Sequence, residues 1–111
     1  MAKPPEFYIQ MKENHPEVTG AYEALGKAAR EAGPLDSQAQ ALVKLGLSIG
    51  AGMEGSTHSS VRKALAAGCS KEEIRHAVIL SVTTLGFPSM MRGRAWVEDV
   101  LTGNGPEQKD G

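Results

Sequence analysis

Apolar residues recur along this chain at spacings of three and four positions, which is the pattern of α-helices that each bury one face. The clearest stripes are Val18, Tyr22, Leu25 and Ala29 in one segment and Leu42, Leu45 and Ile49 in another. The sequence shows no run of strict alternation between apolar and polar residues, as a half-buried strand would require. The pattern therefore predicts an all-α fold.

Glycine and proline divide the chain into about six expected helices. Their approximate ranges are 5–12, 16–32, 37–49, 54–67, 71–85 and 88–101. Pro16 suits the first turn of its helix, because the backbone N–H that proline lacks has no partner at that position. Gly68 and Gly86 are expected to end the fourth and fifth helices.

Two of the expected helix starts carry capping signals. Asp36 or Ser37 can cap the third helix, since a short oxygen-bearing side chain accepts a hydrogen bond from a free backbone N–H. Ser70 and Glu73 have the spacing of a capping box, in which each side chain bonds the backbone N–H of the other residue. This box is the clearest start signal in the chain.

The fifth expected helix is apolar on nearly every side. Ile74, Val78 and Leu85 share one face, while Ile79 and Leu80 lie toward the opposite side. A helix that is apolar all round is usually buried all round. We therefore expect it at the centre of the fold or at a subunit interface.

The length of 111 residues predicts a single domain over residues 1–111, ending in a polar, frayed tail at residues 103–111. Aromatic residues make up only 5% of the chain. The small apolar side chains that replace them supply less buried area per residue. We therefore expect a homo-oligomer, because assembly would bury additional surface.

Charge and hydropathy exclude several classes of protein. The net charge is −1 and the basic residues are spread along the chain, so nucleic-acid binding lacks its electrostatic footprint. No apolar run approaches the roughly 20 residues that span a bilayer, and the first residues have no apolar signal segment. We expect a cytoplasmic protein without a membrane partner. The single cysteine, Cys69, excludes a disulfide within the chain.

Glu54 and His58 are the leading candidates for chemistry. They are four residues apart, so they share one face of the fourth helix, next to its apolar side. A carboxylate beside an imidazole can fix its tautomer and orient it as a general base. The same two side chains could supply part of a metal site, which needs a third ligand. A hydrogen bond with no chemical role is the third interpretation.

Four further residues are candidates for the surroundings of this pair. His76 can complete a pocket, provide the third metal ligand, or make a subunit contact. Arg92 can bind a carboxylate through two parallel hydrogen bonds, or lie exposed. Ser56 and Ser60 lie on the same helix as His58, where we expect them to contact substrate. The chain has no nucleophile-elbow sequence, which argues against a serine hydrolase.

Three consecutive segments of the chain resemble the carboxymuconolactone decarboxylase and alkyl hydroperoxidase D superfamily. They read ALVKLGLSIGAG, GMEGSTHSSVRKALAAG and CSKEEIRHAVILSVTTLGFP, and the resemblance covers about residues 35–101. It implies an all-α fold of about six helices that assembles into trimers or hexamers.

The resemblance also bears on the reaction. In redox members, a Glu, two Cys and a His carry the chemistry, and their places fall here on Ala41, Met53, Ser56 and Ser60. A dithiol cycle needs two thiols and a proton shuttle, so we expect no dithiol peroxidase activity. Decarboxylase-like members keep acidic residues and a His in this helix. Their His falls on Ser60, two residues after His58, which is a rotation of about 200° on a helix.

These observations together predict acid–base chemistry without a cofactor or metal, on a small organic acid or lactone. The reaction would be a decarboxylation, as in a lyase, or an isomerisation. Glu54 and His58 would transfer protons, and His76, Arg92, Ser56 and Ser60 would bind the substrate. The alternatives are a non-catalytic binding or assembly module on a degenerate fold, and a metal site formed by Glu54, His58 and His76.

Overall fold

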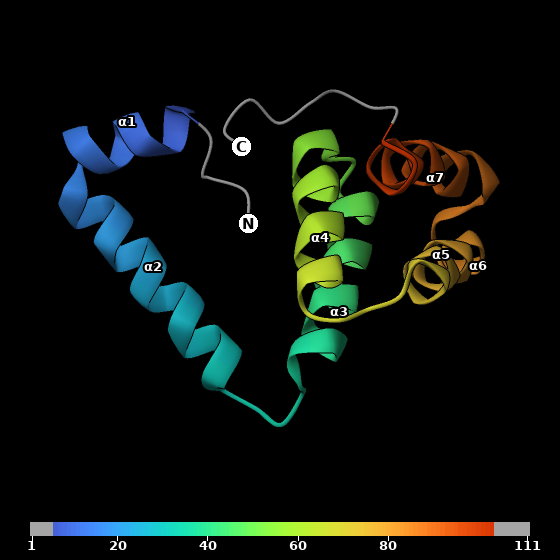
Figure 1. The fold of residues 1–111 in the computed structure, drawn as a ribbon, viewed down its shortest axis with the longest axis horizontal. Coiled ribbons are helices and arrows are strands. Elements are labelled where there is room, and N and C mark those ends of the chain that lie inside the picture. Colours follow the sequence, from blue (N-terminus) through green and yellow to red (C-terminus); the bar gives the residue numbers. More distant parts are fainter. Residues whose placement is uncertain (1–5, 104–111) are drawn as a thin grey trace. The chain divides into compact units, whose positions relative to one another are not determined.

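The computed structural model describes residues 6–103, and all regular structure in that range is helical (Figure 1). The helices are α1 (Glu6–Asn14), α2 (Pro16–Glu31), α3 (Ser37–Gly50), α4 (Glu54–Ala66), α5 (Lys71–Leu80), α6 (Val82–Leu85) and α7 (Phe87–Leu101). The predicted all-α fold is confirmed. The expected helix start at Pro5 and the expected frayed tail beyond Gly103 lie outside the described residues.

The contacts divide the chain into two compact units, with the boundary between Pro34 and Leu35. The first unit contains α1 and α2, which are joined by the side chain of Glu23. Glu23 accepts a hydrogen bond from the Tyr8 hydroxyl and lies 3.5 Å from the Lys12 ammonium. The second unit contains α3 to α7. The single domain expected over residues 1–111 stays a prediction.

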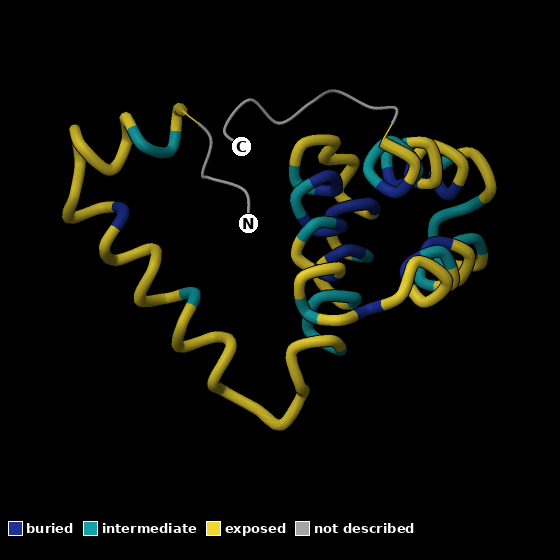
Figure 2. Tube along the Cα trace, in the orientation of Figure 1, coloured by how far each residue is buried: buried dark blue, intermediate teal, exposed yellow. Residues whose placement is uncertain are grey.

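The apolar stripe on α2 is not buried by the described residues of its own unit. Val18, Tyr22 and Leu25 are 56%, 67% and 65% exposed. Thr19 is the one buried residue of this helix, and Figure 2 shows α2 as exposed along almost its whole length. The 3.6-residue spacing therefore predicted the helix correctly, but the described residues of its own unit leave its apolar face uncovered.

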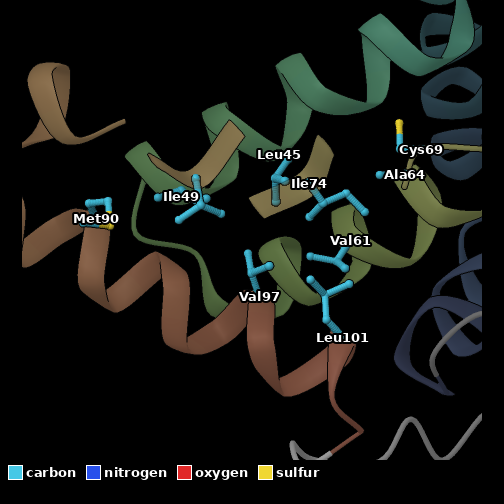
Figure 3. Close-up of a cluster of buried hydrophobic side chains, with 10 residues drawn as sticks. Leu45, Ile49, Val61, Ala64, Cys69, Ile74, Met90, Val97 and Leu101 are labelled. Carbon is cyan, nitrogen blue, oxygen red and sulfur yellow. The ribbon is translucent and has the colours of Figure 1, made fainter. Parts of the chain in front are cut away.

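The hydrophobic core lies in the second unit, among α3, α4, α5 and α7 (Figure 3). Its buried members are Leu45, Ile49, Val61, Ala64, Cys69, Ile74, Val78, Met90, Val97 and Leu101. Full burial of a Val, Leu, Ile or Met side chain stabilises a fold by about 1.5–3 kcal/mol. The same core therefore fixes α4 and α7 side by side, and these are the two helices that carry the site described below.

Gly93 allows α7 to approach α3 closely. It is buried inside α7, and a Cβ atom at this position would lie 2.6 Å from Cγ2 of Ile49. Real Cβ atoms do not approach other atoms so closely. The close packing of α7 on α3 therefore requires that residue 93 has no side chain.

Both capping predictions are confirmed. Asp36 caps α3, because its Oδ1 accepts from the backbone N–H of Ala39 at 2.8 Å. The capping box begins α5: Ser70 Oγ accepts from the N–H of Glu73 at 3.0 Å, and Glu73 Oε1 accepts from the N–H of Ser70 at 2.8 Å. These bonds fix the direction in which each helix leaves its connecting loop.

The expected fifth helix, residues 71–85, is interrupted. Helix α5 ends at Leu80 and α6 begins at Val82. The break lies at Ser81, whose hydroxyl donates to the backbone carbonyl of Val78, three residues earlier, at 2.7 Å. The β-branched run after Ser81 also has a low helix propensity. Ile79 and Leu80 are 50% and 61% exposed, so this segment is not buried on all sides at the centre of the fold. The alternative, that it lies at a subunit interface, stays a prediction.

An ion pair joins α5 to α7. Nε and Nη2 of Arg75 donate to the two carboxylate oxygens of Glu98 at 2.8 and 3.0 Å. These hydrogen bonds are the main cause that lowers the pKa of Glu98 below its ordinary value of 4.5, and they raise the pKa of Arg75. A carboxyl group with a lowered pKa stabilises the fold above its unfolded pKa, and this contribution is lost as the pH falls through the folded pKa.

Glu98→Gln is therefore expected to destabilise the protein at about pH 7 by about 1 kcal/mol, since solvent screens the 42% exposed side chain of Arg75. The difference from the wild type should shrink as the pH falls from the ordinary carboxyl value of 4.5 through the lowered pKa of Glu98, where this side chain takes up a proton. Urea unfolding of both proteins, from neutral pH down through the pKa of Glu98, measures this difference in the free energy of unfolding. Glu13→Gln, on exposed α1, is the matched control. A difference that stays constant with pH would contradict the assignment.

Cys69 lies in the core and its Sγ lies 3.8 Å from the backbone carbonyl oxygen of Gln38. Burial raises the pKa of its thiol, and the carboxylates of Glu73 and Asp36 act in the same direction. A thiol reacts as the thiolate, so both the burial of Cys69 and its raised pKa disfavour its reaction at neutral pH.

Across residues 6–103, none of the helices has the length and apolar character that a membrane crossing requires.

Candidate functional site

The site begins at the turn between α3 and α4. Gly52 has a φ of 71°, a conformation that side chains rarely adopt, and it reverses the chain so that α4 starts at Glu54. Met53, the N-cap residue, makes no side-chain capping bond. Glu54 lies exposed on the first turn of α4, and His58 follows one turn later on the buried side.

His58 forms a hydrogen bond across the contact between α4 and α7. Its Nε2 lies 3.0 Å from Oδ2 of Asp99, and the residue is only 8% exposed. An ionised carboxylate can only accept, so Nε2–H of the imidazole is the donor. This tautomer leaves a free lone pair on Nδ1, which is the atom able to accept a proton.

Glu54 completes a group of three side chains. Glu54, His58 and Asp99 each offer one ligating atom, and these atoms all lie within 4.8 Å of one another. Their environments differ, since Glu54 is exposed, His58 is buried and Asp99 is intermediate. The group therefore combines a fixed imidazole–carboxylate pair with a second carboxylate that faces solvent.

Asp99 was missed by the sequence analysis. It lies 41 residues from His58, so no local spacing relates the two residues. One signal was available: Glu98 and Asp99 both occupy the last turn of α7, where the helix dipole disfavours negative charge. Acidic residues at such a place require partners from other helices, and the structure provides Arg75 for Glu98 and His58 for Asp99.

Arg92 lies against the same turn from the side of α7. Its guanidinium carbon is 5.2 Å from the centre of the Trp96 ring, a distance typical of a cation–π contact. A Cβ atom on Gly52 would lie 3.2 Å from its Nη2. Arg92 is exposed and is thus held near the start of α4 by the indole face.

The serine candidates form a hydroxyl cluster. Ser48 Oγ of α3 lies 2.7 Å from Ser56 Oγ and 3.2 Å from Ser60 Oγ, both of α4. Ser48 and Ser60 are buried. These contacts join Ser56 and Ser60 to α3, and their predicted contact with a substrate stays a prediction.

His76 is exposed on α5 and contributes no atom to the group of three. The third member of the group with Glu54 and His58 is Asp99 and not His76, which the sequence had suggested for that role. The expectation that His76 contacts substrate or a neighbouring subunit stays a prediction.

Comparison with known protein families identifies one family for this chain. Residues 16–99 match the model of the carboxymuconolactone decarboxylase family. The chain therefore belongs to the carboxymuconolactone decarboxylase family, which confirms the resemblance noted from the sequence. No curated protein matches the chain.

One solved structure is similar over most of its length. It is the crystal structure of the apo form of a carboxymuconolactone decarboxylase family protein from Legionella pneumophila. The two chains share 20% sequence identity and a TM-score of 0.77, over 86% of this chain and 85% of that one. At this identity the likeness shows a shared fold.

Proposed function

We propose that this protein catalyses proton transfer on a small organic acid or lactone, without a metal or an organic cofactor. The observation that carries the proposal is the 3.0 Å hydrogen bond from His58 to Asp99, beside the carboxylate of Glu54. A catalytic base needs a fixed orientation and a defined tautomer, and the partly buried carboxylate of Asp99 supplies both. Family membership supports decarboxylase-like chemistry only at the level of the family.

In an isomerisation by this mechanism, Nδ1 of His58 accepts a proton from the carbon next to the substrate carbonyl. The positive charge that forms on the imidazole lies beside Asp99, which keeps the ring in place. In an isomerisation the proton returns to a neighbouring carbon. In a decarboxylation no carbon-bound proton is removed first: the C–C bond to the carboxylate breaks, CO₂ leaves, and the electron pair left on carbon takes a proton from the imidazolium, which the imidazole has formed with a proton from solvent. Glu54, on the solvent side, exchanges protons with the substrate.

Arg92 would bind the carboxylate of the substrate. The stack on Trp96 positions its guanidinium, and the start of α4 beside it presents backbone N–H groups without a side-chain cap. Both features favour an anion at this place. Ser56 and Ser60 would contribute hydroxyl contacts from α4. His76 would contact the substrate only if the substrate extends beyond the group of three side chains toward α5.

The test is exchange of carbon-bound hydrogen in D₂O, followed by proton NMR, with small 2-oxo and 3-oxo acids and unsaturated lactones as probes. We expect the wild type to accelerate exchange for at least one of these probes, and His58→Gln to lose the acceleration. His15→Gln is the matched control, since His15 is exposed at the start of α2 in the other unit. Equal exchange rates with wild type and His58→Gln would overturn the proposal.

A binding or assembly module is the second candidate, and the exposed apolar side chains favour it. Val18, Tyr22 and Leu25 on α2 and Leu80 on α5 are each more than half exposed. A homo-oligomer, such as the trimer or hexamer implied by the family resemblance, would bury such groups. Assembly and catalysis are compatible, so only the absence of any turnover would favour a purely structural role.

A further inference from the structure

We propose that Glu54, His58 and Asp99 also bind a divalent transition-metal ion, with Zn²⁺ as the best-fitting example. The three residues are those of the proposed acid–base site, but binding of the ion does not rest on that chemistry. The proposal stands on the way α4 and α7 bring one imidazole and two carboxylates together.

The distances suit a single ion. Zn²⁺ binds nitrogen and oxygen ligands at about 2.0–2.2 Å, so neighbouring ligand atoms of one ion lie about 3.0–3.6 Å apart. The His58–Asp99 distance of 3.0 Å is already at the lower end of this range. The largest separation in the group is at most 4.8 Å, so it has to close by no more than about 1.8 Å. Glu54 is exposed on the first turn of α4 and can rotate to do so.

The ligand types select the ion. Imidazole nitrogen favours zinc, copper, iron and nickel, whereas all-oxygen sites favour magnesium and calcium. A set of one imidazole and two carboxylates therefore favours Zn²⁺ or Co²⁺ over Mg²⁺. Two carboxylates also neutralise the charge of a divalent ion, which compensates for the removal of water at the partly buried position of Asp99.

Binding of the ion changes the hydrogen bond that the structure shows. The ion would displace the proton from Nε2 of His58 and take its place between the imidazole and Asp99. Nδ1 of the coordinated ring then carries the remaining hydrogen, so it can no longer accept a proton from a substrate. An occupied metal site and proton transfer by His58 thus exclude one another, and Zn²⁺ would inhibit the proposed reaction.

The test is a titration of the untagged, metal-free protein with Zn²⁺ in competition with a chromophoric chelator, in the absence of substrate. We expect one ion per chain, and a Kd raised at least tenfold in each of Glu54→Gln, His58→Gln and Asp99→Asn. Loss of a direct ligand should cost no less than loss of the outer partners of a ligand, which is about 10–100-fold. His76→Gln should leave the Kd unchanged, and Mg²⁺ should not compete.

Several results would overturn the proposal. These are no zinc binding by the wild type, an unchanged Kd in Glu54→Gln, or a loss of binding in His76→Gln equal to that in His58→Gln. Glu54 is exposed, so Glu54→Gln keeps the test valid even if a change at the buried His58 prevents folding. Because no substrate is present, a negative result here leaves the hydrogen-exchange test of the acid–base proposal untouched.

Discussion

Asp99→Asn is expected to lower kcat on any substrate found by hydrogen exchange by about a hundred- to ten-thousandfold, while KM changes little. The side chain of asparagine has nearly the same shape as that of aspartate, but its amide N–H₂ can donate to the imidazole. A donor opposite Nε2 of His58 favours the tautomer that carries its hydrogen on Nδ1. The ring would then stay in place without a lone pair on the atom that accepts the proton.

Neighbouring substitutions separate this role from a merely structural one. Glu98→Gln removes the next carboxylate on α7, whose partner is Arg75, and should leave kcat within about threefold. Asp99→Glu restores an acceptor-only partner and should recover part of the lost kcat. Steady-state kinetics of the three variants, with circular dichroism to check folding, measure these effects. If Asp99→Asn and Glu98→Gln lowered kcat equally, Asp99 would have no role in positioning His58.

Gly93→Ala is expected to destabilise the protein by about 1–3 kcal/mol, although alanine normally favours a helix over glycine. The added Cβ would lie 2.6, 3.2 and 3.3 Å from three carbon atoms of Ile49, which is itself fully buried. Neither α3 nor α7 can move freely, because both contribute to the same core. Denaturant unfolding measures the loss.

Gly46→Ala is the matched control. Gly46 also lies inside a helix of the second unit, but a Cβ there would meet nothing within 4 Å. This variant should gain up to about 1 kcal/mol from helix propensity alone. In addition, Ile49→Ala should cost less in the Gly93→Ala background than in the wild type, by about 0.5–3 kcal/mol. Equal stability of Gly93→Ala and Gly46→Ala would show that the close contact is not maintained in solution.

Local sequence signals predicted the helices well, because each signal acts over a few residues. The capping residue Asp36, the capping box at Ser70 and the helix end at Gly86 all lie where short-range hydrogen bonding or a positive φ requires them. The helix break at Ser81 was not predicted from the sequence, although its cause is also local. The surrounding apolar residues suggested one continuous helix, and they outweighed the back-bonding tendency of a single serine.

The candidate site could be predicted only in part. Glu54 and His58 share a helix face, so their four-residue spacing was sufficient to select them. Asp99 joins them through the packing of α7 on α4, and the register of two helices in contact depends on the whole core rather than on any one motif. His76 was chosen as an imidazole on a face of the fifth expected helix that could meet the site, and it lies exposed outside the group.

The position of Cys69 has a consequence for the conditions under which the protein can operate. Oxidation of cysteine by peroxide proceeds through the thiolate at an accessible position, and the only thiol of this chain is 5% exposed with a raised pKa. The side chains proposed to carry the reaction act through nitrogen and oxygen atoms, and none of them contains sulfur. Exposure to peroxide that inactivates thiol-dependent enzymes should therefore leave both the thiol and the turnover of this protein intact.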